Sequence, residues 1–167
     1  MSVLPVCRFP DAALKTPSRT VGPMTPEVRL LIRDLLETMR HHPRCVGLAA
    51  PQVGANVRVA VVDVTGHPKA ARGSGLLVLV DPEIVSYEGR LVQREGCLSV
   101  PDLTGNVARA VRLQVKARDA EGRVWTKRVE DFEAIAVQHE IDHLDGKLFL
   151  DRVVSLQTDV FRRKKYA

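Results

Sequence analysis

Two histidines separated by three residues stand in the segment QHEIDHLDG, residues 138–146. Residues four apart on a helix point the same way, so His139 and His143 can place two imidazole nitrogens on one metal ion. Glu140 lies about 100° further round the helix, where its carboxylate can reach a water on that metal without binding the metal itself. The alternative is an ordinary helix face with a glutamate between two histidines. The His-Glu-x-x-His spacing predicts a metal site with a general base.

Such a site needs a third ligand. Peptidases with this motif take a further histidine or glutamate from the sequence downstream, but none follows His143 in this chain. Upstream, the segment REGCLSVPD carries Cys97. A thiolate, two imidazoles and one water would complete a tetrahedral catalytic site with an open position. By itself Cys97 would be read as a small buried hydrophobe, but beside a histidine pair that lacks a ligand it is the best candidate.

The histidines belong to a predicted helix over residues 130–146. Asp131 can cap its start and Gly146 can end it. Apolar residues lie on nearly every side of this helix, which places it in the interior of the protein. They are Ala134, Ile135, Ala136, Val137, Ile141 and Leu144.

A second helix and several strands surround it. Thr25 caps and Pro26 begins an amphipathic helix over residues 25–41. Short strands are expected in three ranges bounded by Gly, Pro and Asp, with a hairpin turn at 119–122 into a further strand. The ranges are 57–64, 75–85 and 111–119. We expect an α+β fold of mostly antiparallel sheets around the central metal-binding helix, with the 25–41 helix outside.

Composition limits the class of protein. With 167 residues, 45% of them hydrophobic, the chain suits one domain over residues 1–167. No apolar run is long enough to cross a membrane and the N-terminus lacks the pattern of a secretory signal, so we expect a cytoplasmic protein. The net charge of +5 favours anionic partners. The basic residues of the 111–119 strand alternate along one face without stacking aromatics, so an RNA-binding module is a poor alternative.

The C-terminal segment is expected to form a short helix from about Ser155. It ends in four consecutive basic residues, Arg162, Arg163, Lys164 and Lys165. These are either a solvated, frayed terminus or a contact with an RNA-rich partner such as the ribosome. The first reading is the simpler one.

Three segments together resemble the peptide deformylases, which remove the formyl group from N-formylmethionine on new bacterial proteins. They are GLAAPQ (47–52), EGCLS (95–99) and QHEIDHLDG (138–146), in the family's order and spacing. The N-terminal arm is also similar, so the resemblance covers almost the whole chain. Two positions depart from the family pattern. Cys45 replaces the first glycine of the first motif, and Thr104 stands where several relatives carry an arginine near the substrate groove.

The resemblance implies a role for each motif residue. Cys97, His139 and His143 would hold Fe²⁺, replaceable by Zn²⁺, Ni²⁺ or Co²⁺. A metal-bound water would attack the formyl carbon, with Glu140 as general base and then general acid. Gln52 through its side-chain amide and Leu98 through its backbone N–H would stabilise the oxyanion. A glutamate and an arginine, Glu95 and Arg109, would pair to support the Cys97 segment.

Other roles stay open at this level. Val46 and Gly47 are expected to contact substrate, and Val46, Ile135 and Val137 either line the methionine pocket or pack in the core. Asp142 either orients a ligand imidazole or faces solvent. A peptidase with the same helix motif is disfavoured by the missing downstream ligand. A binding protein without turnover would be expected to have lost a ligand or Glu140, and all are present.

Overall fold

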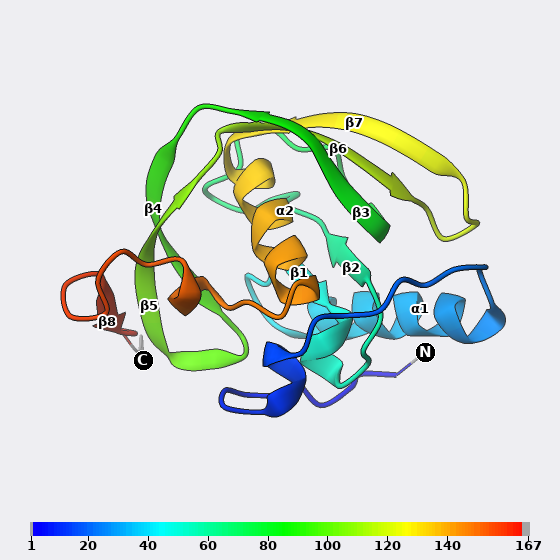
Figure 1. The fold of residues 1–167 in the computed structure, drawn as a ribbon, viewed down its shortest axis with the longest axis horizontal. Helices are drawn as coiled ribbons and strands as arrows, with labels where there is room; N and C mark the ends of the chain where they lie inside the picture. The colour runs from blue at the N-terminus through cyan, green and yellow to red at the C-terminus, as the bar shows by residue number, and fades with distance from the viewer. Residues whose placement is uncertain (1, 165–167) are drawn as a thin grey trace.

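The central element of the structure, a computed structural model that describes residues 2–164, is a buried helix. This helix, α2 (Asp131–Leu144), runs through the middle of the molecule with strands on several sides (Figure 1). Ten of its fourteen residues are buried, including Glu133, Glu140, Asp142 and His143. The predicted α+β fold around a central helix is therefore confirmed.

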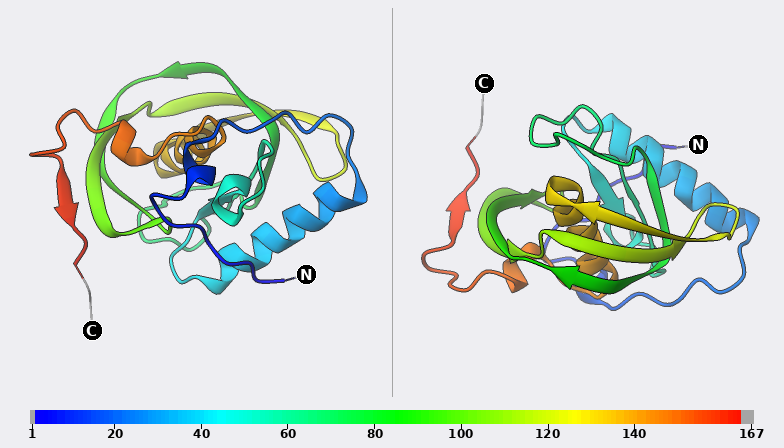
Figure 2. Two further views of the ribbon diagram at one scale, coloured as in Figure 1. Left: turned by 60° about the horizontal axis from the view of Figure 1, so that its bottom comes forward. Right: turned by 90° about the horizontal axis from the view of Figure 1, so that it is seen from above.

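A five-stranded antiparallel sheet covers one side of α2. Its order in space is β1–β2–β3–β6–β7. The left view of Figure 2 shows strands of this sheet curving around the helix. The strands are β1 (Gly47–Ala49), β2 (Val59–Val62), β3 (Leu77–Glu88), β6 (Arg112–Arg118) and β7 (Val124–Glu130). The predicted hairpin turn is present, because Asp119 and Gly122 close the β6–β7 connection.

A second sheet carries the Cys97 segment. It contains β4 (Leu91–Cys97), β5 (Val100–Arg109) and β8 (Val160–Arg162), all antiparallel. The expected helix from Ser155 is wrong: residues 156–158 form a turn, and the chain continues as β8 along β5. The Arg94 guanidinium lies 3.7 Å from the centre of the Phe161 ring, and this contact, together with the free edge of β5, favours a strand over a frayed helix.

Helix α1 (Pro26–His41) lies outside, as expected. The Thr25 hydroxyl accepts a hydrogen bond from the Val28 N–H at 3.3 Å, which satisfies an end group of the helix. Its buried stripe, which includes Ile32, Leu35 and Met39, packs against residues of β1 and β2 in one hydrophobic cluster. No helix in the described part of the chain is long and apolar enough to cross a membrane.

The ends of α2 differ in part from the prediction. The residue that caps its start is Glu130, and Asp131 is the first helical residue, with φ of 56°. Gly146 follows the end of the helix with φ of 75°, and a Cβ there would lie 2.9 Å from the Lys15 carbonyl oxygen. Glycine is therefore required at 146 both for the left-handed backbone and for close contact with the N-terminal segment.

Candidate metal centre

The two sheets and α2 bring the three predicted ligands together. Cys97 ends β4, and His139 and His143 lie one turn apart on α2. One ligand atom from each lies within 4.8 Å of the others, and the Cys97 Sγ is 3.4 Å from the His143 Nε2. Cys97 and His143 are 6% and 1% exposed. A soft thiolate and two imidazoles in a dry site form a donor set that suits Zn²⁺ or Fe²⁺.

The electrostatics of this cluster favour a thiolate. Burial by itself raises the pKa of the Cys97 thiol, but the charge of His143 and hydrogen bonds from His139 and His143 hold that pKa well below its ordinary value. The thiolate is the form of cysteine that binds metals. The surroundings of Cys97 therefore favour the form of its side chain that a metal ion binds.

His139 is oriented by a carboxylate. Its Nδ1 lies 2.8 Å from the Glu95 Oε1, which leaves Nε2 for a metal. Glu95 is in turn held by Arg109, whose Nε and Nη2 donate at 2.8 and 2.9 Å in a two-pronged contact. Burial would raise the pKa of Glu95, but the hydrogen bonds from Arg109 and His139 lower it to about 2. The expected pair of Glu95 and Arg109 is present, and its contact with His139 shows what the pair can do for the site.

Asp142 takes neither of the two roles considered for it. It is 4% exposed, so it does not face solvent, and its partners are arginines rather than an imidazole. Arg109 Nη1 donates to Asp142 at 2.5 Å, and Arg152 donates to the same carboxylate at 2.8 and 3.1 Å. Asp142 thus fixes the far end of the Arg109 side chain. The contact of Arg152 with Asp142 could not be predicted, because no pattern in the neighbouring sequence indicates that Arg152 pairs with a residue of α2.

Glu140 is buried beside the three ligands. It is 4% exposed, and burial raises its pKa to about 7. Among the described residues its Oε2 has no hydrogen-bond partner, and neither has the Nδ1 of His143. Buried carboxylate oxygens are almost always paired with protein or ordered water. An unpaired oxygen next to the Cys-His-His cluster therefore fits a water or substrate group held between Glu140 and a metal.

Gly47 provides the space for this carboxylate. A Cβ at Gly47 would lie 2.6 Å from the Glu140 Oε1 and 2.9 Å from its Cδ. From the sequence, Gly47 was expected to contact the substrate. In the structure the group that approaches is the Glu140 side chain. The backbone conformation of Gly47 plays no part, because the lack of room for a Cβ is by itself enough to require glycine.

We expect Gly47→Ala to lower kcat/KM about 10- to 100-fold while metal content is retained, because a shift of about 1 Å in a catalytic group has an effect of this size. The readout is steady-state kinetics alongside metal analysis. The double variant Gly47→Ala/Glu140→Asp shortens the displaced acid by one methylene and is expected to be at least as active as Glu140→Asp alone. A double variant weaker than both single variants would contradict the steric explanation.

Gln52 and Leu98 both lie next to Cys97. The Gln52 Oε1 accepts from the Ala49 N–H at 3.0 Å, which fixes the amide so that its Nε2 faces Ser99 Oγ at 3.1 Å and Cys97 Sγ at 3.5 Å. Gln52 therefore both caps the local backbone and directs an N–H toward Cys97, the predicted ligand. Leu98 is half-buried at the β4–β5 turn and borders a pocket.

The remaining candidate residues make packing, hydrogen-bonding or strand-pairing contacts. Val137 is fully buried in the main hydrophobic cluster, against which the half-buried Val46 also packs. The Cys45 Sγ donates to the Gly47 carbonyl at 3.2 Å, and burial raises its pKa to about 12. Cys45 therefore remains a neutral thiol, and among the described residues the potential metal ligands that lie together are Cys97, His139 and His143. Thr104 pairs with Phe161 across the β5–β8 ladder.

Comparison with known proteins identifies the family. The family described as "Polypeptide deformylase" matches residues 3–159. The chain is 43% identical to a peptide deformylase of Alkalilimnicola ehrlichii over 98% of this chain and 89% of that protein. It is 44% identical to one of Halothermothrix orenii over 93% and 97% of the two chains.

Solved structures agree. A peptide deformylase from Legionella pneumophila superposes with a TM-score of 0.85 at 38% identity, covering 93% of this chain and 89% of that one. One from Thermotoga maritima gives 0.84 at 33% identity, covering 93% and 100%. The chain belongs to the polypeptide deformylase family, whose members remove the N-formyl group from nascent peptides.

Proposed function

We propose that this chain acts as a single metal-dependent catalytic domain that hydrolyses the formyl group of N-formylmethionyl peptides, with Glu140 moving the proton. The observation that carries the proposal is that three donors from two distant segments meet beside a buried carboxylate, one oxygen of which has no partner within residues 2–164. A divalent metal held by Cys97, His139 and His143 would supply Lewis-acid polarisation of the formyl oxygen and acidify a water.

Glu140 has the features of a proton carrier. A pKa of about 7 lets its carboxylate accept a proton from the attacking water and release it to the departing amine near neutral pH. Gly47 keeps the Oε1 of Glu140 against β1, while the unpaired Oε2 remains available for that proton. The same side chain thus serves as base in the first half of the reaction and as acid in the second.

The charge that develops on the formyl oxygen needs donors that are already in place. We assign this role to the Gln52 Nε2, oriented by the Ala49 N–H, and to the backbone N–H of Leu98. A fixed donor in comparable sites contributes about 2.7–4 kcal/mol to transition-state stabilisation. We also assign substrate contacts to Val46, just before β1, and to Gly47, its first residue.

We assign Fe²⁺ as the physiological ion on the basis of the family resemblance, with Zn²⁺, Ni²⁺ and Co²⁺ as substitutes. Enzyme loaded with Fe²⁺ under argon is expected to release formate from formyl-Met-Ala-Ser. After exposure to air it should lose most of this activity, because the thiolate of Cys97 beside ferrous iron is open to oxidation. Zinc-loaded enzyme should be unaffected by air. Acetyl-Met-Ala-Ser serves as the control, since its cleavage would indicate general amide hydrolysis. Equal activity of aerobic and anaerobic iron enzyme would contradict the expected oxygen sensitivity and leave the deformylase function intact.

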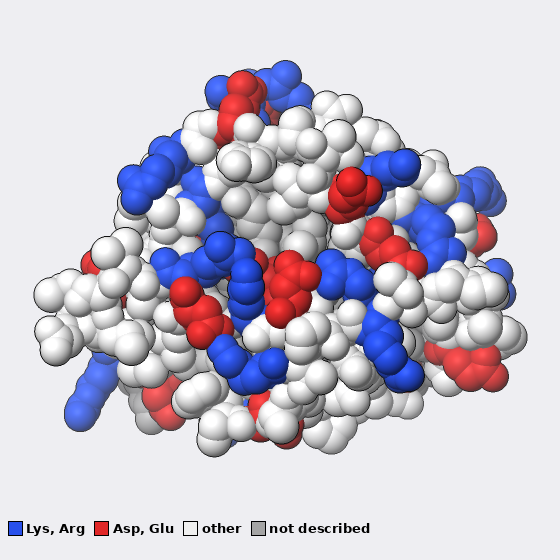
Figure 3. Space-filling model, in the orientation of Figure 1, with Lys and Arg blue, Asp and Glu red and all other residues white. Residues whose placement is uncertain are grey.

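Nascent formylated polypeptides are the proposed partners, in the cytoplasm. A ribosome contact through the basic C-terminal segment remains a weaker proposal: Arg162 and Lys164 are exposed, Arg163 is half-buried, and Lys165 lies outside the described residues. On the face seen in Figure 3, basic and acidic side chains are interspersed rather than gathered into one basic area. That face favours a small-peptide enzyme over an RNA-binding module.

A further inference from the structure

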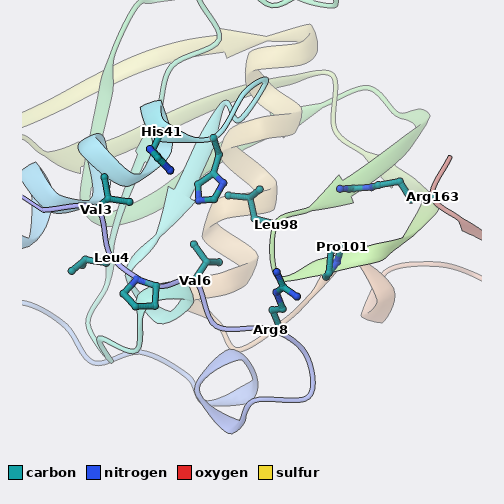
Figure 4. A pocket seen from close by; sticks show the side chains of 10 residues that line it. Val3, Leu4, Val6, Arg8, His41, Leu98, Pro101 and Arg163 are labelled. Atoms are coloured by element: carbon teal, nitrogen blue, oxygen red, sulfur yellow. The ribbon is translucent and has the colours of Figure 1, made fainter. Parts of the chain in front are cut away.

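A pocket of about 420 Å³ lies beside the metal centre and has no assigned role. Its walls come from four parts of the chain: the N-terminal arm, the end of α1, the β4–β5 turn and the segment after β8 (Figure 4). Most of the wall is apolar, formed by residues 3–6, Leu98 and Pro101. This wall is therefore a surface on which part of a peptide can lie.

The polar part of the pocket is entirely basic or imidazole. Arg8 and Arg163 line it together with His41 and His42, and none of the described residues that line it is acidic. Within residues 2–164, neither guanidinium takes part in an ion pair. Two arginines without a carboxylate partner inside one pocket give it a chemistry that attracts an anion.

The pocket is adjacent to the reacting centre. Leu98, which lines it, directly follows the ligand Cys97 in the chain. Arg163 lies against Gly96, the residue before that ligand, so closely that a side chain at Gly96 would collide with the guanidinium. The N-terminal arm is tied to the same region, because the Cys7 N–H donates to the Gln52 carbonyl at 2.6 Å and the Phe9 N–H to the Ser99 carbonyl at 2.8 Å.

Arg163 is held in place by the second sheet. Its backbone N–H donates to the Asp102 carbonyl at 2.9 Å, which extends the pairing of β8 with β5. In the close view its guanidinium points from the C-terminal segment toward Leu98 (Figure 4). The C-terminal segment thus places the Arg163 guanidinium near Cys97. The simpler expectation from the sequence was that this segment is a frayed terminus.

We propose that this pocket is a substrate subsite that selects formyl peptides with an acidic side chain at the third or fourth residue, through Arg163 and Arg8. The proposal rests on the proposed deformylase function. An extended peptide advances about 3.3–3.6 Å per residue, so a side chain two or three residues beyond the methionine comes level with a pocket whose wall starts next to Cys97. The apolar wall receives the stem of that side chain, and the guanidinium groups receive its carboxylate.

The test compares C-terminally amidated peptides formyl-Met-Ala-X-Ala and formyl-Met-Ala-Ala-X, with X as Glu, its neutral isostere Gln, or Lys. Iron- or zinc-loaded enzyme is expected to favour Glu over Gln about three- to tenfold in kcat/KM at one of the two positions, and to disfavour Lys. The preference should appear in KM rather than kcat, since the contact is distant from the formyl group. It should weaken at high salt.

Variants that remove or reverse a charge test which arginines cause the preference for Glu over Gln. Arg163→Gln and Arg8→Gln should each reduce the Glu/Gln ratio, their combination should bring it to about one, and Arg163→Glu should shift the preference toward Lys. Arg123→Gln, an exposed arginine at the β6–β7 turn, removes the same charge elsewhere and should leave the ratio unchanged. The ratio is measured on one enzyme sample, so differences in folding or metal content cancel.

The outcomes separate the two proposals. Cleavage of all the peptides with a Glu/Gln ratio near one in the parent enzyme would overturn the subsite and leave the deformylase function intact. A clear ratio that survives in the double arginine variant would also overturn it. Failure of fully metallated parent enzyme to cleave any formyl peptide would overturn the proposed function, and the subsite with it.

Discussion

Glu140→Gln is expected to lower kcat/KM for formyl-Met-Ala-Ser by about 10²- to 10⁴-fold while the enzyme keeps its metal. Glutamine preserves the size of the side chain against Gly47 but cannot carry a proton between water and the leaving amine. Because the lost interaction belongs to the transition state, kcat should fall with little change in KM. Steady-state kinetics and metal analysis of the same samples measure both quantities.

The matched control is Glu133→Gln on the same helix. Glu133 is also a buried carboxylate, but it accepts hydrogen bonds from the Ser74 N–H at 2.7 Å and the Ser74 hydroxyl at 2.8 Å, away from the metal ligands. Its substitution should lower stability and leave kcat within a small factor of the parent value. Comparable losses in both variants would indicate damage to α2 and would remove the case for Glu140 as the proton carrier.

Cys97→Ser is expected to abolish stable metal binding and activity together. A serine hydroxyl stays protonated at neutral pH and is a poor ligand for a soft divalent ion, so only the two histidines remain. Loss of an outer partner of a ligand already weakens metal binding about 10- to 100-fold, and loss of the ligand itself should exceed that. Metal content per chain after gel filtration, and a titration with Zn²⁺, provide the measurement.

Cys7→Ser is the control for this change. Cys7 lies half-buried on the N-terminal arm, and its contact with Gln52 is made by the backbone N–H, which serine retains. This variant should bind one metal per chain with parent-like activity. A Cys97→Ser enzyme with full metal content would show that Cys97 is not a ligand, whatever its activity.

Much of the site could be read from spacing along the chain. The interval from His139 to His143 needs only helical geometry to place two ligands on one side, and α1 and α2 were both expected from their apolar patterns and caps. The motif with Cys97 was identified by its residue types and by the lack of any downstream ligand. These are local properties, so they hold before the chain is folded.

The ion-pair network around α2 could not be read this way. The Glu95–Arg109 pair was expected only through the family resemblance, and no pattern indicated that Arg109 also holds Asp142 or that Arg152 completes the contact. Each of these contacts joins residues from different elements. A charged residue in a sequence has many possible partners, and folding selects one of them by distance and burial.

The sequence by itself determined the chemistry of this protein: the ligand types, the general base, the central helix and the family. Tertiary structure alone decided that the C-terminal segment is a strand along β5, that Gly47 makes room for Glu140, and that Arg163 and Arg8 line one pocket beside the Cys97 segment. Strand pairing and close contact depend on which distant backbones come together. Hydrogen bonding along a free sheet edge and burial in the folded state outweigh local preference, and neither is written in the spacing of neighbouring residues.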